Sequence, residues 1–144
     1  MQYDAFVTVE KDSFLIDFPD CPGCQTFAAP NEDIAERAAE ALAGWLEAHL
    51  VSGQAPPEPR RFRAKGRGRR TIEVPVPAKL AAKLALRWAR KRAGLTQAEL
   101  ARRAGLSQPA VARLEDPDYN TTLDMLERVA AALGARLEVD LRAA

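Results

Sequence analysis

Short alternating patterns of apolar and polar side chains open the chain and indicate β-strands with one buried face. Residues 5–9 and 14–18 alternate in this way and are separated by a short polar turn. A loop rich in proline and glycine follows at 19–23, and residues 25–28 predict a brief third strand. The first part of the chain is therefore expected to form a small sheet.

Helical spacing replaces the alternation after residue 30. Asn31 is a suitable N-cap, and Gly53 is expected to end the helix. The face predicted to pack on the sheet consists of Ile34, Ala38, Leu42, Trp45 and His49. A fourth strand is predicted over 71–76, and its Pro75 favours an edge position. The pattern leaves open whether this strand joins the first sheet or begins a second domain.

The second half of the chain is predicted to be helical, with one helix over about 78–93 and two short helices within 95–115. Thr96 and Glu99 have the spacing of a capping box, which starts the first short helix. Gly105 provides the break between the two, Ser107 caps the second, and Pro109 stands in its first turn, where it removes no helical hydrogen bond.

The second short helix has a polar outer face. Val111 and Leu114 are spaced to point inward, which leaves Gln108 and Arg113 outside. Glutamine and arginine are the side chains that pair bidentately with adenine and guanine edges in the major groove. The alternative is a solvated helical hairpin whose polar residues merely face water.

This segment resembles the XRE-type helix-turn-helix domains of phage repressors. The positions that match their signature are Thr96, Gln97, Leu100, Ala101, Gly105, Leu106, Ser107, Val111, Leu114 and Glu115. The family usually continues into a further helix, and residues 121–134 have that pattern. The resemblance implies DNA binding.

Residues 136–141 alternate again and predict a final short strand. Such a strand needs a partner. Pairing with its equivalent in a second subunit would give the dimer with which helix-turn-helix proteins grip two half-sites. Pairing with 71–76 inside one chain is the alternative, and the dimer is favoured.

The length of 144 residues allows one domain or two small ones. Residues 1–59 carry 11 acidic and 2 basic side chains, a net charge of −9, whereas 60–144 carry 9 acidic and 19 basic ones, a net charge of +10. This asymmetry predicts two domains with different partners: 1–59, then a basic flexible linker at 60–70, then a DNA-binding domain at 71–144. No membrane span or signal peptide is recognised, so a soluble, cytoplasmic protein is expected.

Motifs spread over most of the chain resemble the HicB antitoxin family of bacterial toxin–antitoxin systems. They are FPDCPGCQTFA at 18–28, the acidic helix running into GQAPPEP at 53–59, IEVPVPAKLAAKLALRWA at 72–89 and LGARLEVDL at 133–141. Cys21 departs from the family's usual leucine or isoleucine, and the arginine-rich run at 60–70 is unusual for it.

The resemblance implies an α+β protein: a partial RNase H-like βββαβ domain, then an all-α helix-turn-helix domain ending in a short strand. It implies two partners, a HicA-type toxin that is a small basic mRNA-cleaving ribonuclease, and operator DNA, bound by a homodimer or a dimer of dimers. The expected DNA-binding residues are Gln97, Arg102, Arg103, Ser107, Gln108, Pro109, Ala110 and Arg113. The toxin-binding candidates in the acidic domain are Asp17, Asp20, Glu36 and Glu40.

Other chemistry has weaker support. Cys21 and Cys24 form a CxxC motif, but a zinc site needs about four ligands and the chain adds one distant His49. Acidic residues at 4, 10, 17 and 20 raise the possibility of a metal-dependent nuclease, although Asp17 should face away from the core. No enzyme activity, cofactor or metal is therefore expected. A stand-alone transcription regulator with a ligand-sensing or oligomerising N-terminal domain is the alternative function.

Overall fold

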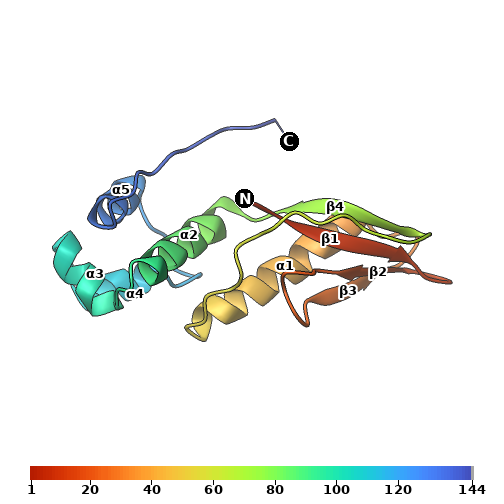
Figure 1. Cartoon of the computed structure of the whole chain (residues 1–144), viewed down its shortest axis with the longest axis horizontal. Helices are drawn as coiled ribbons and strands as arrows, with labels where there is room; N and C mark the ends of the chain where they lie inside the picture. Colours follow the sequence, from red (N-terminus) through yellow and green to blue (C-terminus); the bar gives the residue numbers. More distant parts are fainter. Residues whose placement is uncertain (144) are drawn as a thin grey trace. The chain divides into compact units, whose positions relative to one another are not determined.

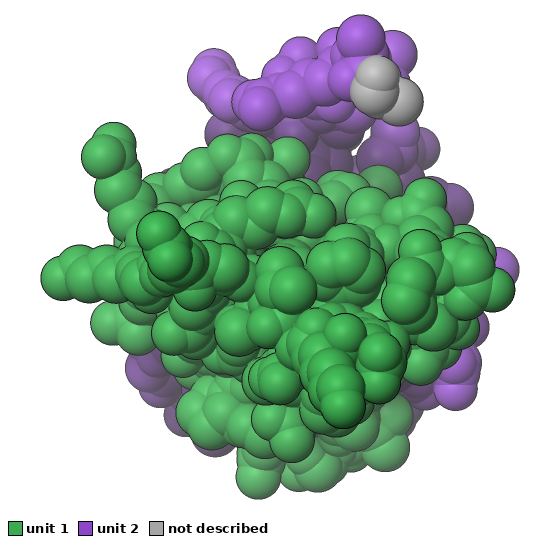
Figure 2. Space-filling model, turned by 90° about the vertical axis from the view of Figure 1, so that its right-hand side faces the viewer, with its two compact units in different colours: residues 1–81 green, residues 82–144 purple. Residues whose placement is uncertain are grey.

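The computed structural model describes residues 1–143 and divides the chain into two compact units. Unit 1 covers residues 1–81 and unit 2 begins at Ala82 (Figure 2). Each unit has its own core and is described by itself. Among the described residues, no helix is long and apolar enough to cross a membrane.

Unit 1 contains a four-stranded antiparallel sheet (Figure 1). Its strands are β1 (Gln2–Val9), β2 (Phe14–Asp17), β3 (Gln25–Ala28) and β4 (Arg69–Pro75), in the order β3-β2-β1-β4. The three predicted N-terminal strands are confirmed, but β1 begins earlier than expected, at Gln2, and Val9 at its end is exposed. The fourth strand joins this sheet at its edge, where the missing N–H of Pro75 interrupts no internal ladder.

Helix α1 (Ile34–Val51) packs across one face of the sheet (Figure 1). Its N-cap is Asp33 and not Asn31: the Asp33 carboxylate accepts hydrogen bonds from the amides of Ala35 at 2.8 Å and Glu36 at 3.2 Å. The helix therefore starts later than expected. The residues it buries are Ala38, Leu42, Leu46 and Leu50. Sheet residues Tyr3, Ala5, Val7 and Ile16 are buried as well.

The predicted face of α1 was correct at its start and wrong at its end. Trp45 and His49 are only half-buried, and their rings stack on each other with centroids 3.7 Å apart. Leu46 and Leu50 take the buried positions instead. A spacing of four after Leu42 selects Leu46, whereas the expectation had followed a spacing of three to Trp45.

Residues 60–68 differ from the expected flexible linker, because they are hydrogen-bonded to unit 1 before the chain enters β4. The amide of Arg60 donates to the Asp20 carboxylate at 2.7 Å, and that of Phe62 donates to the Asp4 carboxylate at 2.6 Å. The amide of Ala64 donates to Thr71 Oγ1 at 2.8 Å. The arginine-rich segment thus belongs to the sheet unit (Figure 1).

This placement changes the meaning of the charge asymmetry. Unit 1 holds 10 basic and 12 acidic residues, and residues 82–144 hold 11 basic and 8 acidic ones. The net charges of the compact units are therefore −2 and +3. The −9 and +10 halves of the sequence do not coincide with the units.

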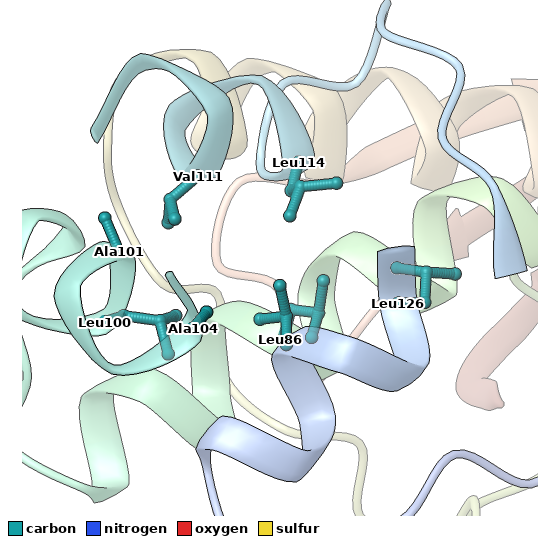
Figure 3. Close-up of a cluster of buried hydrophobic side chains, with 8 residues drawn as sticks. Leu86, Leu100, Ala101, Ala104, Val111, Leu114 and Leu126 are labelled. Carbon is teal, nitrogen blue, oxygen red and sulfur yellow. The ribbon is translucent and has the colours of Figure 1, made fainter. Parts of the chain in front are cut away.

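Unit 2 is a small helical bundle formed by most of α2 (Ala78–Arg92) with α3 (Gln97–Ala104), α4 (Gln108–Leu114) and α5 (Leu123–Ala132). All four helices contribute to one apolar cluster (Figure 3). Its buried members are Leu86, Leu100, Ala101, Ala104, Val111, Leu114, Leu126 and Val129. The inward positions predicted for the second short helix, Val111 and Leu114, are confirmed.

The final strand predicted over 136–141 is not formed. Residues 135–143 have no regular secondary structure. Leu137 packs on the helical cluster, while Val139 and Leu141 are exposed by 68% and 95%. A strand requires a second strand for its backbone groups, and unit 2 has none among its described residues.

Candidate nucleic-acid interface and partner surface

Helices α3 and α4 have the helix-turn-helix geometry that their capping residues predict. The Thr96 hydroxyl accepts from the amide of Glu99, whose carboxylate accepts in return from the amide of Thr96 at 2.9 Å. Gly105 ends α3 in the left-handed conformation, with φ of 66°. The Ser107 hydroxyl caps α4, and Pro109 stands in its first turn. Local sequence thus fixes both helices and the turn between them.

The predicted DNA-binding side chains lie mainly on the surface of these helices. Ala110 and Gln97 are half-buried, and the exposed members are Arg102, Arg103, Ser107, Gln108, Pro109 and Arg113. The guanidinium of Arg113 lies 5.8 Å from the ring centre of Tyr119. A helix that enters a major groove needs exposed polar and basic side chains. Small residues in its first turn let it approach the bases closely.

The structure brings Gln97 and Gln108 together. Gln108 Nε2 donates to Gln97 Oε1 at 2.9 Å, and Gln97 Nε2 donates to Glu115 Oε2 at 3.3 Å. Gln97 of α3 therefore connects Gln108, at the start of α4, with Glu115, at the end of α4. This arrangement orients the Gln108 side chain before any ligand is bound, which lowers the entropy lost on binding.

Glu115 is the functional-site residue that sequence reasoning missed. Its side chain is 2% exposed and lies against two arginines of α2. Arg90 donates through Nε at 2.6 Å and through Nη2 at 3.0 Å, and Arg87 donates through Nε at 2.8 Å. Burial by itself raises the pKa of Glu115, but the hydrogen bonds and charges of Arg90 and Arg87 hold it below its usual value.

The helix-turn-helix signature contained the signal for this cluster. Glu115 closes the matched motif, but the motif does not show that two arginines of the preceding helix meet it. The ionised cluster positions α4 by its C-terminal end and α3 through Gln97. It is a positioning group, since the carboxylate is buried and cannot touch a ligand directly.

Arg128 of α5 holds the turn from the other side. Its Nε donates to the carbonyl of Ala104 at 2.8 Å, and its Nη2 donates to that of Gly105 at 2.9 Å. These carbonyls are left unsatisfied by the end of α3, and a cation favours the negative end of a helix. Arg128 thereby fixes the path of the chain from α3 to α4.

The acidic candidates for partner binding divide into two groups. Asp20 is 2% exposed, and its carboxylate is occupied by the amide and Nε of Arg60, at 2.7 and 2.8 Å. It therefore holds the chain and presents no free surface. Asp17 is half-buried, 3.4 Å from Arg69, while Glu36 and Glu40 lie exposed on α1.

The acidic side chains of α1 share one exposed stripe. Glu36, Glu40 and Glu47 are spaced by four and seven residues, which places them on one side of a helix. Glu40 is paired with Arg37 at 3.3 Å, on the surface. A carboxylate stripe of this kind attracts a cationic partner.

The CxxC motif is buried within unit 1. Cys21 and Cys24 are 0% and 5% exposed, and Cys24 Sγ donates to the carbonyl of Ala41 at 3.6 Å. Burial raises the pKa of Cys21 to about 12 and that of Cys24 to about 11. Thiols protonated to this extent are poor nucleophiles and poor metal ligands, so both cysteines serve packing.

Asp4 and His49 also have local partners. The buried Asp4 carboxylate accepts from Phe62 and lies 3.3 Å from Arg61. His49 Nδ1 lies 2.8 Å from the carbonyl of Trp45. Over residues 1–143, no group of three or more histidine, cysteine or carboxylate side chains is placed to hold a metal ion.

The chain is similar to several known proteins. A helix-turn-helix family model matches residues 86–139. Antitoxin HicB 1 of Photorhabdus laumondii is 29% identical over 133 residues, which cover 92% of this chain and 81% of that protein. Antitoxin HicB of Pseudomonas fluorescens is 38% identical over 69 residues, 48% of this chain and 47% of its own. A chain of a solved HicA3 and HicB3 toxin–antitoxin complex is 27% identical, with a TM-score of 0.47, and covers 54% of this chain and 99% of its own.

Fold and motif together define an α+β protein with a C-terminal helix-turn-helix. The helix-turn-helix match lies in unit 2, and the relation to Antitoxin HicB 1 extends through both units. Over most of its length the chain is similar to a HicB antitoxin of a toxin–antitoxin system, and its residues 86–139 match a helix-turn-helix.

Proposed function

We propose that this chain neutralises a HicA-type ribonuclease toxin by binding it directly and represses its own operon through α3 and α4. The observation that carries the proposal is the relation to Antitoxin HicB 1, which extends over 92% of the chain. The two units divide the work, with unit 1 taking the toxin and unit 2 the operator. The protein acts by binding and not by catalysis.

The toxin surface is assigned to the exposed side of α1 and the adjoining sheet. Glu36 and Glu40 contribute accessible negative charge there, and Asp17 adds a partly neutralised carboxylate. Charges of this kind mainly raise the association rate and make it depend on salt. Asp20 is removed from the contact candidates because it binds Arg60.

The operator surface is assigned to α4 and the end of α3. Gln108 and Arg113 read base edges, with Pro109 and Ala110 against the groove floor. Arg102 and Arg103 contact phosphates, and Gln97 orients Gln108. Two such units in a dimer bind two half-sites about one helical turn apart.

Two reciprocal variants test the division of labour in the full-length protein. Arg113→Ala should cost about 1–3 kcal/mol of discrimination between operator and unrelated DNA and leave toxin affinity unchanged. Glu36→Gln with Glu40→Gln should slow toxin association and leave operator binding unchanged. Stopped-flow fluorescence and calorimetry measure the rate and the affinity of toxin binding, and fluorescence anisotropy measures binding to operator DNA.

The outcomes separate the alternatives. Loss of both activities in folded Arg113→Ala would contradict the two-unit assignment. Operator binding without any toxin binding would instead support a stand-alone transcription regulator. RNA cleavage by the chain itself would contradict the proposal.

A further inference from the structure

The arginine-rich segment of unit 1 has two classes of cation. Three arginines are neutralised within the unit: Arg60 by Asp20, Arg61 by Asp4 and Glu73, and Arg69 by Asp17. The remaining four basic side chains are exposed and have no hydrogen-bond or ion-pair partner in the described part of the chain. These four, called the basic turn below, are Arg63, Lys65, Arg67 and Arg70.

The backbone of the basic turn is held in place. Ala64 is bonded to Thr71, and the amide of Val9 in β1 donates to the carbonyl of Gly68 at 2.8 Å. Gly66 and Gly68 adopt φ values of 102° and 72°, which reverse the chain into β4. Free positive charges are thus concentrated on a fixed turn and on Arg70 at the start of β4, at one end of the sheet.

Four unpaired cations on an ordered turn repel one another and favour a polyanion. We propose that the basic turn binds the phosphate backbone of double-stranded DNA, without reading its sequence. This inference rests on the proposed DNA binding by α3 and α4. Because the same chain joins both units, a second phosphate contact would be intramolecular and would add affinity at little entropic cost.

The aromatic rings near the segment favour duplex DNA over a single strand. Proteins that bind single strands stack bases on exposed rings. Here the rings of Phe6 and Phe62 pack edge to face, with centroids 6.2 Å apart, and the guanidiniums of Arg69 and Arg60 lie over them at 4.3 and 5.2 Å. Phe27 is exposed but lies on β3, at the opposite edge of the sheet from β4.

The test compares wild-type protein with the variant Arg63→Gln, Lys65→Gln, Arg67→Gln, Arg70→Gln. Affinity for an operator duplex, an unrelated duplex and a single-stranded RNA is measured from about 50 to 200 mM salt. The slope of log affinity against log salt should become less steep by about 3 to 4, since each phosphate contact contributes about 0.9. Affinity for both duplexes should fall by the same factor, about tenfold or more at low salt.

The matched control keeps the charge. Arg63→Lys, Arg67→Lys, Arg70→Lys should retain the wild-type slope, because a phosphate contact needs a positive charge and not a guanidinium fork. Circular dichroism should show unchanged folding in both variants, since the four side chains have no partner in unit 1.

The outcomes distinguish this inference from the proposed function. An unchanged salt slope in the glutamine variant, with operator discrimination intact, would overturn the basic turn alone. A change confined to single-stranded RNA would also overturn it. A wild-type protein that prefers neither duplex would overturn the operator assignment, while a reduced slope would still support the basic turn.

Discussion

Glu115 shows how a single residue connects the stability of unit 2 with the geometry of α3 and α4. The carboxylate is buried among Arg87, Arg90 and Gln97, so its charge is fully paired inside the protein. A buried pair of this kind contributes little net stability, because desolvation offsets the attraction. Removing one partner is nevertheless costly, since it leaves the other charges buried alone.

We expect Glu115→Gln to lower the free energy of unfolding of unit 2 by about 3–5 kcal/mol, because Arg87 and Arg90 lose their counter-charge. Urea unfolding followed by circular dichroism measures the change. The control Glu127→Gln alters an exposed carboxylate on α5 and should stay within about 0.5 kcal/mol of wild type. Equal effects of the two substitutions would contradict the role of the cluster.

The same cluster predicts sensitivity to acid. Because the folded-state pKa of Glu115 lies below its unfolded value of 4.5, its contribution is complete above that pH. The contribution is lost as the pH falls through the folded value. Thermal unfolding between pH 7 and pH 3 should show a steeper loss of stability in wild type than in Glu115→Gln, and parallel curves would contradict this assignment.

Gly105, in the turn between α3 and α4, is a second residue whose substitution has a predictable effect on stability. Alanine there would carry a Cβ 3.0 Å from Arg128 Nη2 and would have to adopt φ of 66°. We expect Gly105→Ala to destabilise unit 2 by about 1–2 kcal/mol. Gly44→Ala in α1 meets nothing within 4 Å and should instead stabilise unit 1 by about 0.5–1 kcal/mol. Differential scanning calorimetry measures both, and effects of the same sign would contradict the account.

The structural role of a residue could be predicted where its partners lie nearby in sequence. The caps at Thr96 and Ser107 and the break at Gly105 depend on neighbours within a few positions, and all three are confirmed. The prediction of Asn31 as the N-cap of α1 was wrong, because Asp33, two residues later, is an equally suitable cap and is the one used. Local chemistry allowed both.

At the scale of elements, the segment 60–68 could not be predicted from its own composition. Its high charge indicates a solvated linker, yet its backbone amides bond to Asp20 and Asp4, which are 40 and 58 residues away. The sequence indicated these two carboxylates only as candidates for partner binding or metal ligation. Their actual role is to hold the arginine-rich segment on the sheet.

We expect Asp20→Asn to lower the local opening free energy of this segment by about 1–3 kcal/mol, because a charge-assisted bond to Arg60 is lost. Amide hydrogen exchange at Arg60 and Phe62 should accelerate accordingly. Glu10→Gln, an exposed change in the turn after β1, is the control and should leave that exchange unchanged. Unchanged exchange in Asp20→Asn would contradict the anchoring role.

At the scale of the whole molecule, the exposed C-terminal segment supports the proposed dimer. Residues 136–141 have the alternation of a strand but form none in a single chain, and Val139 and Leu141 remain exposed. Two copies could satisfy both backbones by pairing these segments. A sequence pattern shows that a strand is possible, but it does not show whether the partner strand lies in the same chain.

We expect Val139→Asp with Leu141→Asp to convert a dimer to a monomer and to weaken operator binding, while toxin binding is retained. The change should not unfold unit 2, because both side chains are exposed. Analytical ultracentrifugation measures the mass. The control Glu138→Gln alters the opposite face of the segment and should remain dimeric. A monomeric wild type would contradict the dimer.

The central claim is the proposed neutralisation of a toxin by direct binding. It is tested most directly by mixing the full-length protein with the HicA-type protein encoded beside it. Size-exclusion chromatography and an RNA-cleavage assay should be run on the same mixture. The account predicts a stable complex and loss of cleavage at stoichiometric amounts, with Arg113→Ala as effective as wild type. Free migration of the two proteins at micromolar concentration, with cleavage undiminished, would contradict it.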